Sequence, residues 1–206
     1  SLNLGNNLEI GRFSNNNHYF PGKINSVSIF DYALSESQVT TLWGGGTSVS
    51  NPMALPSPPV AYYPLGTSAY NGEYLAENNA IGDYVFDFDN TGGSPNDVIT
   101  APNILPASSD FTISFWVNPD SSQSTYATTT LFGNSANGEN IQIISRFGNG
   151  YFYVGNGASA YISQSNAVQA NVWTLITVTY DNTASVLTAY LNGGENTYTS
   201  SSGITL

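Results

Sequence analysis

The passage at 85–97 holds the side chains whose types and spacing are best suited to chemistry. Calcium prefers several carboxylate, amide and carbonyl oxygens, and an acidic passage where a strand runs into a turn supplies them. Asp and Asn also cap turns by bonding to their own backbone, so a plain turn is the alternative. The sequence therefore predicts a calcium site or a capped turn at Asp87, Asp89, Asn90 and Asp97, with Glu77 and Asp83 as further candidate ligands.

Four tyrosines form the second group of candidates. They lie in expected loops and two-faced strands rich in Asn, Ser and Gly: Tyr126, Tyr151, Tyr153 and Tyr161. An aromatic ring stacks on the C–H face of a sugar, while nearby amides and hydroxyls bond the sugar's hydroxyl groups, and neither contact needs charge. Pairing of the rings across a sheet is the alternative. The sequence predicts a carbohydrate-binding surface or an aromatic sheet face.

Catalytic groups are scarce in this chain. His18 is the single histidine and sits in a run of asparagines, where a solvated surface role is the default, so a Ser-His-Asp arrangement has little support. Glycoside hydrolysis needs two carboxyl groups facing one bond. Asp87 and Asp89 are the nearest such pair, and they lack a third partner. Cysteine is absent, which excludes thiolate chemistry and disulfides. We expect a protein that is not an enzyme.

The charge balance and the hydropathy of the chain argue against two classes of partner, nucleic acid and a membrane crossed by a helix. Lys and Arg number 3 against 14 Asp and Glu, and the formal net charge is −11. Binding to nucleic acid needs cations that neutralise phosphates, so nucleic acid is excluded as an expected partner. An apolar run of about 18 residues, the minimum for a membrane-spanning helix, does not occur.

The hydrophobic pattern predicts an all-β fold. Apolar residues alternate with polar ones in the segment 111–117, and period-two segments at 140–146 and 151–154 flank a Gly-Asn-Gly turn signal. A further hairpin is expected from 173–180 and 185–191. Residues 60–206 thus read as the opening and central strands of a sandwich.

The first 43 residues look like a separate fragment. Strands are expected at 8–12 and 23–30, followed by one short helix at 35–43, where Ser35 and Gln38 make a capping box. The segment 44–59 follows, with four prolines, three glycines and no charge, which is the composition of a linker. We expect three parts: residues 1–43, the Gly/Pro-rich linker 44–59, and residues 60–206.

Several motifs resemble one known family. These are AYYPL at 61–65, DFTISFWVNP at 110–119, WTLITVTYD at 173–181, AYLNG at 189–193, LEIGR at 8–12, YFPGKI at 19–24 and IFDYALS at 29–35. Together they resemble the laminin-G-like modules of the concanavalin A-like lectin/glucanase superfamily. The resemblance implies a two-sheet antiparallel jelly-roll sandwich, and in many such modules a calcium ion at its rim. The E-x-D-x-E pattern of the superfamily's glucanases does not occur here.

The order of the motifs departs from that family, because the closing motifs come first. Either the chain is one period of a tandem array cut out of register, or it is a circular permutant whose linker 44–59 joins the former termini. In both cases residues 1–43 complete a sandwich begun by residues like 60–206, within one chain or across a chain boundary. Without them, 60–206 exposes strand edges and apolar faces. The chain also begins without Met or a leader, so we expect a processed protein or an excerpt.

The expected function is a non-catalytic structural and adhesive module of an extracellular assembly. A virion decoration or fibre, a surface filament and a tandem-repeat adhesin all fit, at an extracellular, cell-surface or virion location. A nearly uncharged surface rich in Tyr, Asn and Ser resembles packed interfaces, so other copies of the chain or neighbouring repeats are the expected partners, together with a glycan. The alternative is a carbohydrate-binding lectin module, calcium-assisted, of a larger secreted protein.

Overall fold

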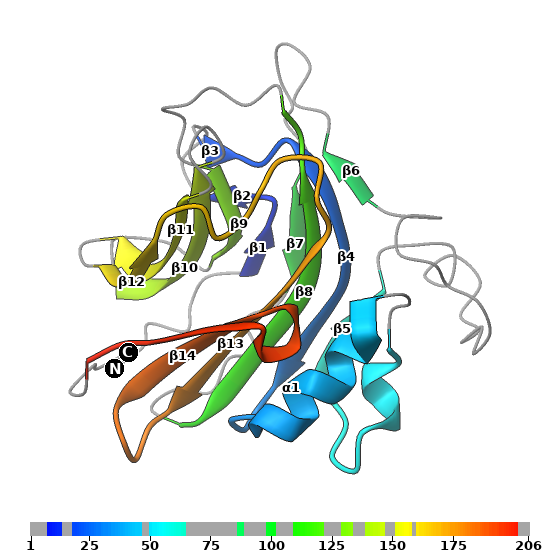
Figure 1. The fold of residues 1–206 in the computed structure, drawn as a ribbon, viewed down its shortest axis with the longest axis vertical. Coiled ribbons are helices and arrows are strands. Elements are labelled where there is room, and N and C mark those ends of the chain that lie inside the picture. The colour runs from blue at the N-terminus through cyan, green and yellow to red at the C-terminus, as the bar shows by residue number, and fades with distance from the viewer. Residues whose placement is uncertain are drawn as a thin grey trace.

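The chain folds into an antiparallel sandwich of two sheets, so the all-β prediction is confirmed (Figure 1). A computed structural model describes residues 8–13, 18–46, 50–64, 86–88, 98–101, 109–121, 129–133, 139–146, 151–157 and 160–201. Figure 1 shows the sheets as two layers, with the single described α-helix beside the larger one.

The six-stranded sheet contains, in spatial order, β12 (Ala160–Gln164), β11 (Tyr151–Gly157), β10 (Glu139–Arg146), β9 (Thr129–Gly133), β1 (Leu8–Ile10) and β7 (Ile99–Ala101). The seven-stranded sheet contains β15 (Asn196–Thr199), β14 (Val186–Leu191), β13 (Thr174–Asp181), β8 (Phe111–Pro119), β4 (Gly22–Phe30) and β5 (Ala61–Tyr63), with β6 (Phe86–Phe88) also paired to β4. A small ribbon pairs β2 (Arg12–Phe13) with β3 (His18–Tyr19).

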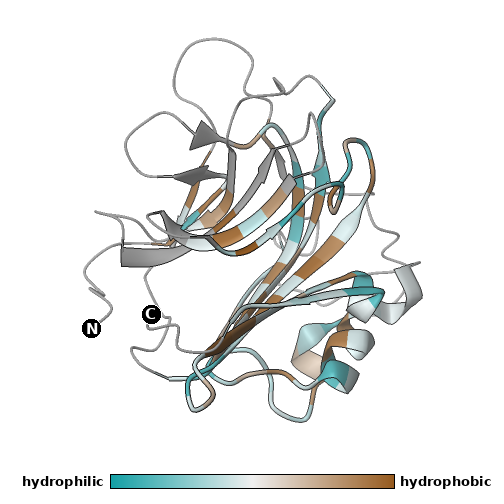
Figure 2. Cartoon of the chain, turned by 60° about the vertical axis from the view of Figure 1, so that its left-hand side comes forward, coloured by the Kyte–Doolittle hydropathy of each residue, from teal (hydrophilic) through white to brown (hydrophobic). Residues whose placement is uncertain are grey.

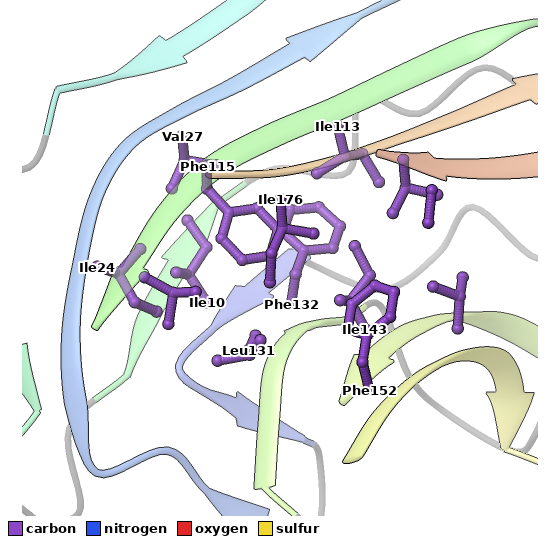
Figure 3. Close-up of a cluster of buried hydrophobic side chains, with 14 of the residues drawn as sticks. Ile10, Ile24, Val27, Ile113, Phe115, Leu131, Phe132, Ile143, Phe152 and Ile176 are labelled. Atoms are coloured by element: carbon purple, nitrogen blue, oxygen red, sulfur yellow. The ribbon is translucent and has the colours of Figure 1, made fainter. Parts of the chain in front are cut away.

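Side chains alternate between the two faces of β8, which explains how this strand contributes to two hydrophobic clusters. Phe111, Ile113 and Phe115 face the other sheet and belong to the main core, which Figure 3 shows in close-up. Trp116 belongs to a second cluster, on the outer side of the seven-stranded sheet. The side chains between these, Thr112 and Ser114, are buried as well, because neighbouring elements cover both faces of the strand. Figure 2 shows the corresponding hydrophobic and hydrophilic bands along the strands.

Strands from the first 43 residues occupy interior positions in both sheets. β1 lies between β9 and β7, with Ile10 opposite Phe132 of β9 and Ile99 of β7. β4 lies between β8 and β5, with Ile29 opposite Ile113 of β8. In this single-chain structure both strands pair with strands of the same chain, and Ile10, Ile24 and Val27 contribute to the shared core (Figure 3).

The helix α1 (Glu36–Trp43) begins with the capping box that the sequence predicts. The backbone N–H of Gln38 donates to the Ser35 hydroxyl at 3.4 Å, and the Ser35 N–H donates to Gln38 Oε1 at 2.9 Å. Val39 and Leu42 are buried in the second cluster, so α1 covers part of the outer face of the seven-stranded sheet. Gly44 ends the helix in the left-handed region. No helix in the described ranges has the length and apolarity needed to cross a bilayer.

The segment 44–59, which its composition indicates to be a linker, connects α1 to β5 and is partly packed. Asn51 Oδ1 accepts a hydrogen bond from Met53 N–H at 2.9 Å and thereby caps a 3-10 turn at Pro52–Ala54. Leu55 is buried in the second cluster, and the Tyr32 hydroxyl donates to the Ser57 carbonyl at 2.6 Å. Proline favours the first position of such a turn, and Leu55 has an apolar cluster to enter.

Candidate carbohydrate-binding surface

Tyr153 lies on the outer face of the six-stranded sheet. It is held in β11 opposite Ile144 of β10 and Ser163 of β12. Its neighbours Phe152 and Val154 are fully buried in the main core, so strand alternation directs Tyr153 away from the other sheet. The side chain is half-buried and Ser163 is exposed. A fixed aromatic ring beside an exposed hydroxyl is the arrangement that sugar stacking needs.

Tyr151 occupies a position on the same face. It is two residues before Tyr153 in β11 and lies opposite Arg146 of β10. Since side chains repeat every second residue on one face of a strand, the structure brings the positions of these two predicted tyrosines together. Tyr151 is described through its backbone, and its side chain lies outside the description.

Tyr161 has different surroundings. Its ring packs against the main core between the sheets, and burial raises the pKa of its hydroxyl, with the nearby Tyr180 adding to the shift. The pairing of β11 with β12 shifts register beside it, between Val154 and Gly155, so simple alternation does not give its direction. Tyr126 lies outside the described residues. Of the four predicted tyrosines, Tyr153 has a described side chain on the outward face of β11.

The predicted calcium ligands are described in part only. Asp87 lies in β6, and its backbone is opposite Lys23 of β4. The other candidates fall outside the described residues: Glu77, Asp83, Asp89, Asn90 and Asp97. Within the described residues, no three acidic or histidine side chains gather in a way that would hold a metal ion. The calcium site stays a prediction.

His18, the single histidine, pairs in β3 with Phe13 of β2. It therefore lies in the small two-stranded ribbon and on neither of the two main sheets. The structure describes its backbone and not its side chain.

A second polar and aromatic surface was not predicted from the sequence. Lys23, the single lysine of the chain, lies opposite Asn118 of β8, and Trp173 directly precedes Thr174 of β13, which lies opposite Val117. Lys23 is exposed, and Asn118 and Trp173 are half-buried. Ile24 and Val117, the strand neighbours of Lys23 and Asn118, are fully buried in the main core. Lys23 and Asn118 therefore face outward. The three residues are far apart in sequence. The available sequence signal for this surface was the single lysine of the chain, next to the apolar Ile24.

The comparisons with known proteins support the fold. A family model of the concanavalin A-like lectin/glucanases superfamily, the Laminin_G_3 model, matches residues 90–205, more than half of the 206 residues. Neither the curated proteins nor the solved structures give a match to this chain. The family match indicates a carbohydrate-binding or adhesive module. With β8 to β14 inside the matched region and a two-sheet antiparallel sandwich around them, the chain belongs to the concanavalin A-like lectin/glucanase superfamily.

Proposed function

We propose that this chain is a non-catalytic adhesive module of an extracellular assembly, and that it attaches by binding glycan on the outer face of β11 and β12. The observation that carries the proposal is the position of Tyr153, half-buried on an outward sheet face and in register with the exposed Ser163. A ring held by strands on both sides loses little conformational entropy on binding.

The charge of the chain defines the class of glycan. With a formal net charge of −11, the protein repels sulfated and carboxylated sugars at long range. Stacking on a tyrosine and hydrogen bonding to hydroxyls and amides need no charge on the sugar. The proposed ligands are therefore neutral hexose or N-acetylhexosamine chains.

An adhesive role is favoured over hydrolysis by the same surface. Hydrolysis needs two carboxyl groups a few ångströms apart across the scissile bond. The positions around Tyr153 on the outer sheet face are Tyr151, Ile144 and Ser163, none of which carries a carboxyl group. Modules of the laminin-G-like type are generally lectin-like, non-catalytic and extracellular, and assemblies such as a virion fibre, a surface filament or a tandem-repeat adhesin would use this module for attachment.

The second candidate function is a calcium-assisted lectin module of a larger secreted protein. It depends on the acidic passage at 87–97, from which β6 carries Asp87 to a position opposite Lys23. Calcium titration separates the two candidates. Glycan binding that requires calcium, and that Asp89→Asn abolishes, supports the lectin with a metal; binding unchanged by a chelator supports the adhesive module without one.

The test of the proposed surface is a panel of immobilised neutral glycans probed with the intact chain and three variants. Tyr153→Ala removes the ring and should weaken binding about tenfold, the equivalent of about 1.4 kcal/mol. Tyr153→Phe keeps the ring and should retain most of the affinity. Tyr32→Ala, which removes a half-buried tyrosine next to the second cluster, is the matched control and should bind like the intact chain. Equal binding by Tyr153→Ala and the intact chain would contradict the proposal.

A further inference from the structure

Among the described strands, β12, β5 and β7 lie at sheet edges that are protected against pairing with another chain. The pairing of β12 with β11 contains a register shift between Val154 and Gly155. β5 and β7 are three residues long, and the sequence continues with Pro64 after the first and Pro102 after the second. Bulges, short edges and prolines are the usual devices that prevent a sheet from adding a foreign strand.

β15 has neither a register shift nor a proline, and it is one residue longer than β5 and β7. It pairs with β14 over four residues in unbroken register, and no described strand lies on its other side. Asn196, Thr197 and Thr199 are exposed, and β15 contains neither proline nor a charged residue. An uncharged, regular and exposed edge strand is a template for pairing with a further strand.

The hydrogen bonding beside β15 shows which of its backbone groups face outward. Ser200 N–H donates to the Leu187 carbonyl at 2.9 Å, in line with the register in which Tyr198 lies opposite Ala189. In an antiparallel ladder every second residue bonds to the same neighbour. Ser200, Tyr198 and Asn196 therefore direct their backbone groups toward β14, and those of Thr197 and Thr199 point away from the sheet.

We propose that β15 is a self-association site, at which two copies of this chain pair their β15 strands antiparallel around a two-fold axis at Tyr198. An antiparallel edge is complementary to an identical edge, because the outward N–H and C=O groups alternate in the same order on both. Thr197 pairs with the partner's Thr199 and Thr199 with the partner's Thr197. The two pairs supply four backbone hydrogen bonds and join the seven-stranded sheets of both copies.

The proposed register also places the side chains of the two copies favourably opposite one another. Tyr198 lies directly opposite the partner's Tyr198 in a pair that is not hydrogen-bonded, which is the closer kind and favours contact between aromatic rings. Glu195 lies opposite the partner's Ser201. This placement matters because two copies with a net charge of −11 each repel one another, and like charges directly opposite would add to the repulsion.

The contact is short, so the dimer should be weak and dependent on concentration. It is separate from the proposed glycan surface, since β15 belongs to the seven-stranded sheet and β11 to the six-stranded one. An intact chain that binds glycan but never dimerises would therefore overturn this inference and leave the proposed function standing.

Sedimentation velocity over a wide concentration range tests the pairing. The intact chain should show a monomer–dimer equilibrium. Thr197→Pro removes an outward N–H and leaves the ladder to β14 intact, so it should weaken the dimer at least about tenfold. Thr197→Ala keeps that N–H and is the matched control, with a dimer like that of the intact chain. An intact chain that stays monomeric at every concentration, or a Thr197→Pro variant that dimerises equally well, would overturn the proposal.

Cross-linking tests the register without depending on the proline variant. The chain contains no cysteine, so single cysteines give an unambiguous result. Mild oxidation of Tyr198→Cys should yield a disulfide-linked dimer, since residues opposite each other in such a pair have Cβ atoms about 4.5–5.5 Å apart. Thr183→Cys, in an exposed turn, is the control and should stay monomeric. Cross-linking of both variants to the same extent, or of neither, would contradict the register.

Discussion

The indole ring of Trp43, the last residue of α1, stacks on that of Trp116 in the middle of β8, with ring centroids 5.0 Å apart and an interplanar angle of 25°. This contact joins the segment 1–43 to β8, which lies between β13 and β4 in the seven-stranded sheet. Thr40 adds a second connection, because its hydroxyl donates to the Gly193 carbonyl at 2.9 Å. The helix is thus anchored to β8 and to the turn after β14.

Replacement of Trp43 by alanine should destabilise the whole fold. The half-buried ring contacts Trp116 and the second cluster, and its loss should lower the free energy of unfolding by about 2 kcal/mol, below the range for a fully buried tryptophan. Urea denaturation measures the change. Met53→Ala, at a side chain that is 43% exposed, is the control and should shift stability by less than about 0.5 kcal/mol. Equal stability of the two variants would refute the anchoring role.

Alanine substitutions at two glycines distinguish the effect of backbone strain from the effect of a steric clash. Gly193 and Gly45 both have positive φ, at 69° and 73°. A Cβ at Gly193 would clash with Cβ of Trp43, and a Cβ at Gly45 would meet nothing within 4 Å. We expect Gly45→Ala to cost about 1 kcal/mol from strain alone and Gly193→Ala clearly more, since Trp43 must also move. Thermal unfolding of both variants checks the order, and the reverse order would contradict the packing described here.

Alkaline pH should weaken the fold through Tyr62. Burial raises the pKa of its hydroxyl above 10.0, and the Ser26 hydroxyl, 3.3 Å from it, opposes the shift. The folded state therefore keeps this proton to higher pH than the unfolded state. The free energy of unfolding should be unaffected by this group below pH 10 and should fall as pH rises above it.

The variant Tyr62→Phe isolates this contribution. Stability measured by denaturant titration above pH 10 should decline less steeply in the variant than in the intact chain. A residual slope is expected, because burial also raises the pKa values of Tyr32, Tyr161 and Tyr190. Identical slopes in the variant and the intact chain would show that Tyr62 does not contribute.

Local sequence signals predicted the elements of the fold well. The alternation in 111–117 predicted both faces of β8, because strand geometry alone sends Phe115 and Trp116 in opposite directions. The capping box at Ser35 and Gln38 likewise depends on residues three apart, and the structure contains it. The family motifs predicted the two-sheet sandwich, which the structure and the family match both support.

The arrangement of the candidate surfaces was harder to predict, because it depends on register between distant strands. Ser26 has a positive φ of 53° in the middle of β4, where the pairing with β8 shifts. No local sequence pattern predicts this irregularity. The irregularity nevertheless determines which residues of β4 share the outer face with Asn118 and Trp173. The direction of Tyr161 was hard to predict for the same reason, since the register shift between β11 and β12 falls at this residue.

The central structural claim is that β1 and β4 complete the sandwich of the chain that carries them. Unfolding of a fragment consisting of residues 60–206, compared with the intact chain by urea titration, tests it most directly. The fragment lacks the strands between β9 and β7 and between β8 and β5, so we expect no cooperative transition from it, and recovery of the transition when residues 1–59 are added. A fragment that unfolds cooperatively as a monomer, at the denaturant concentration of the intact chain, would contradict the claim.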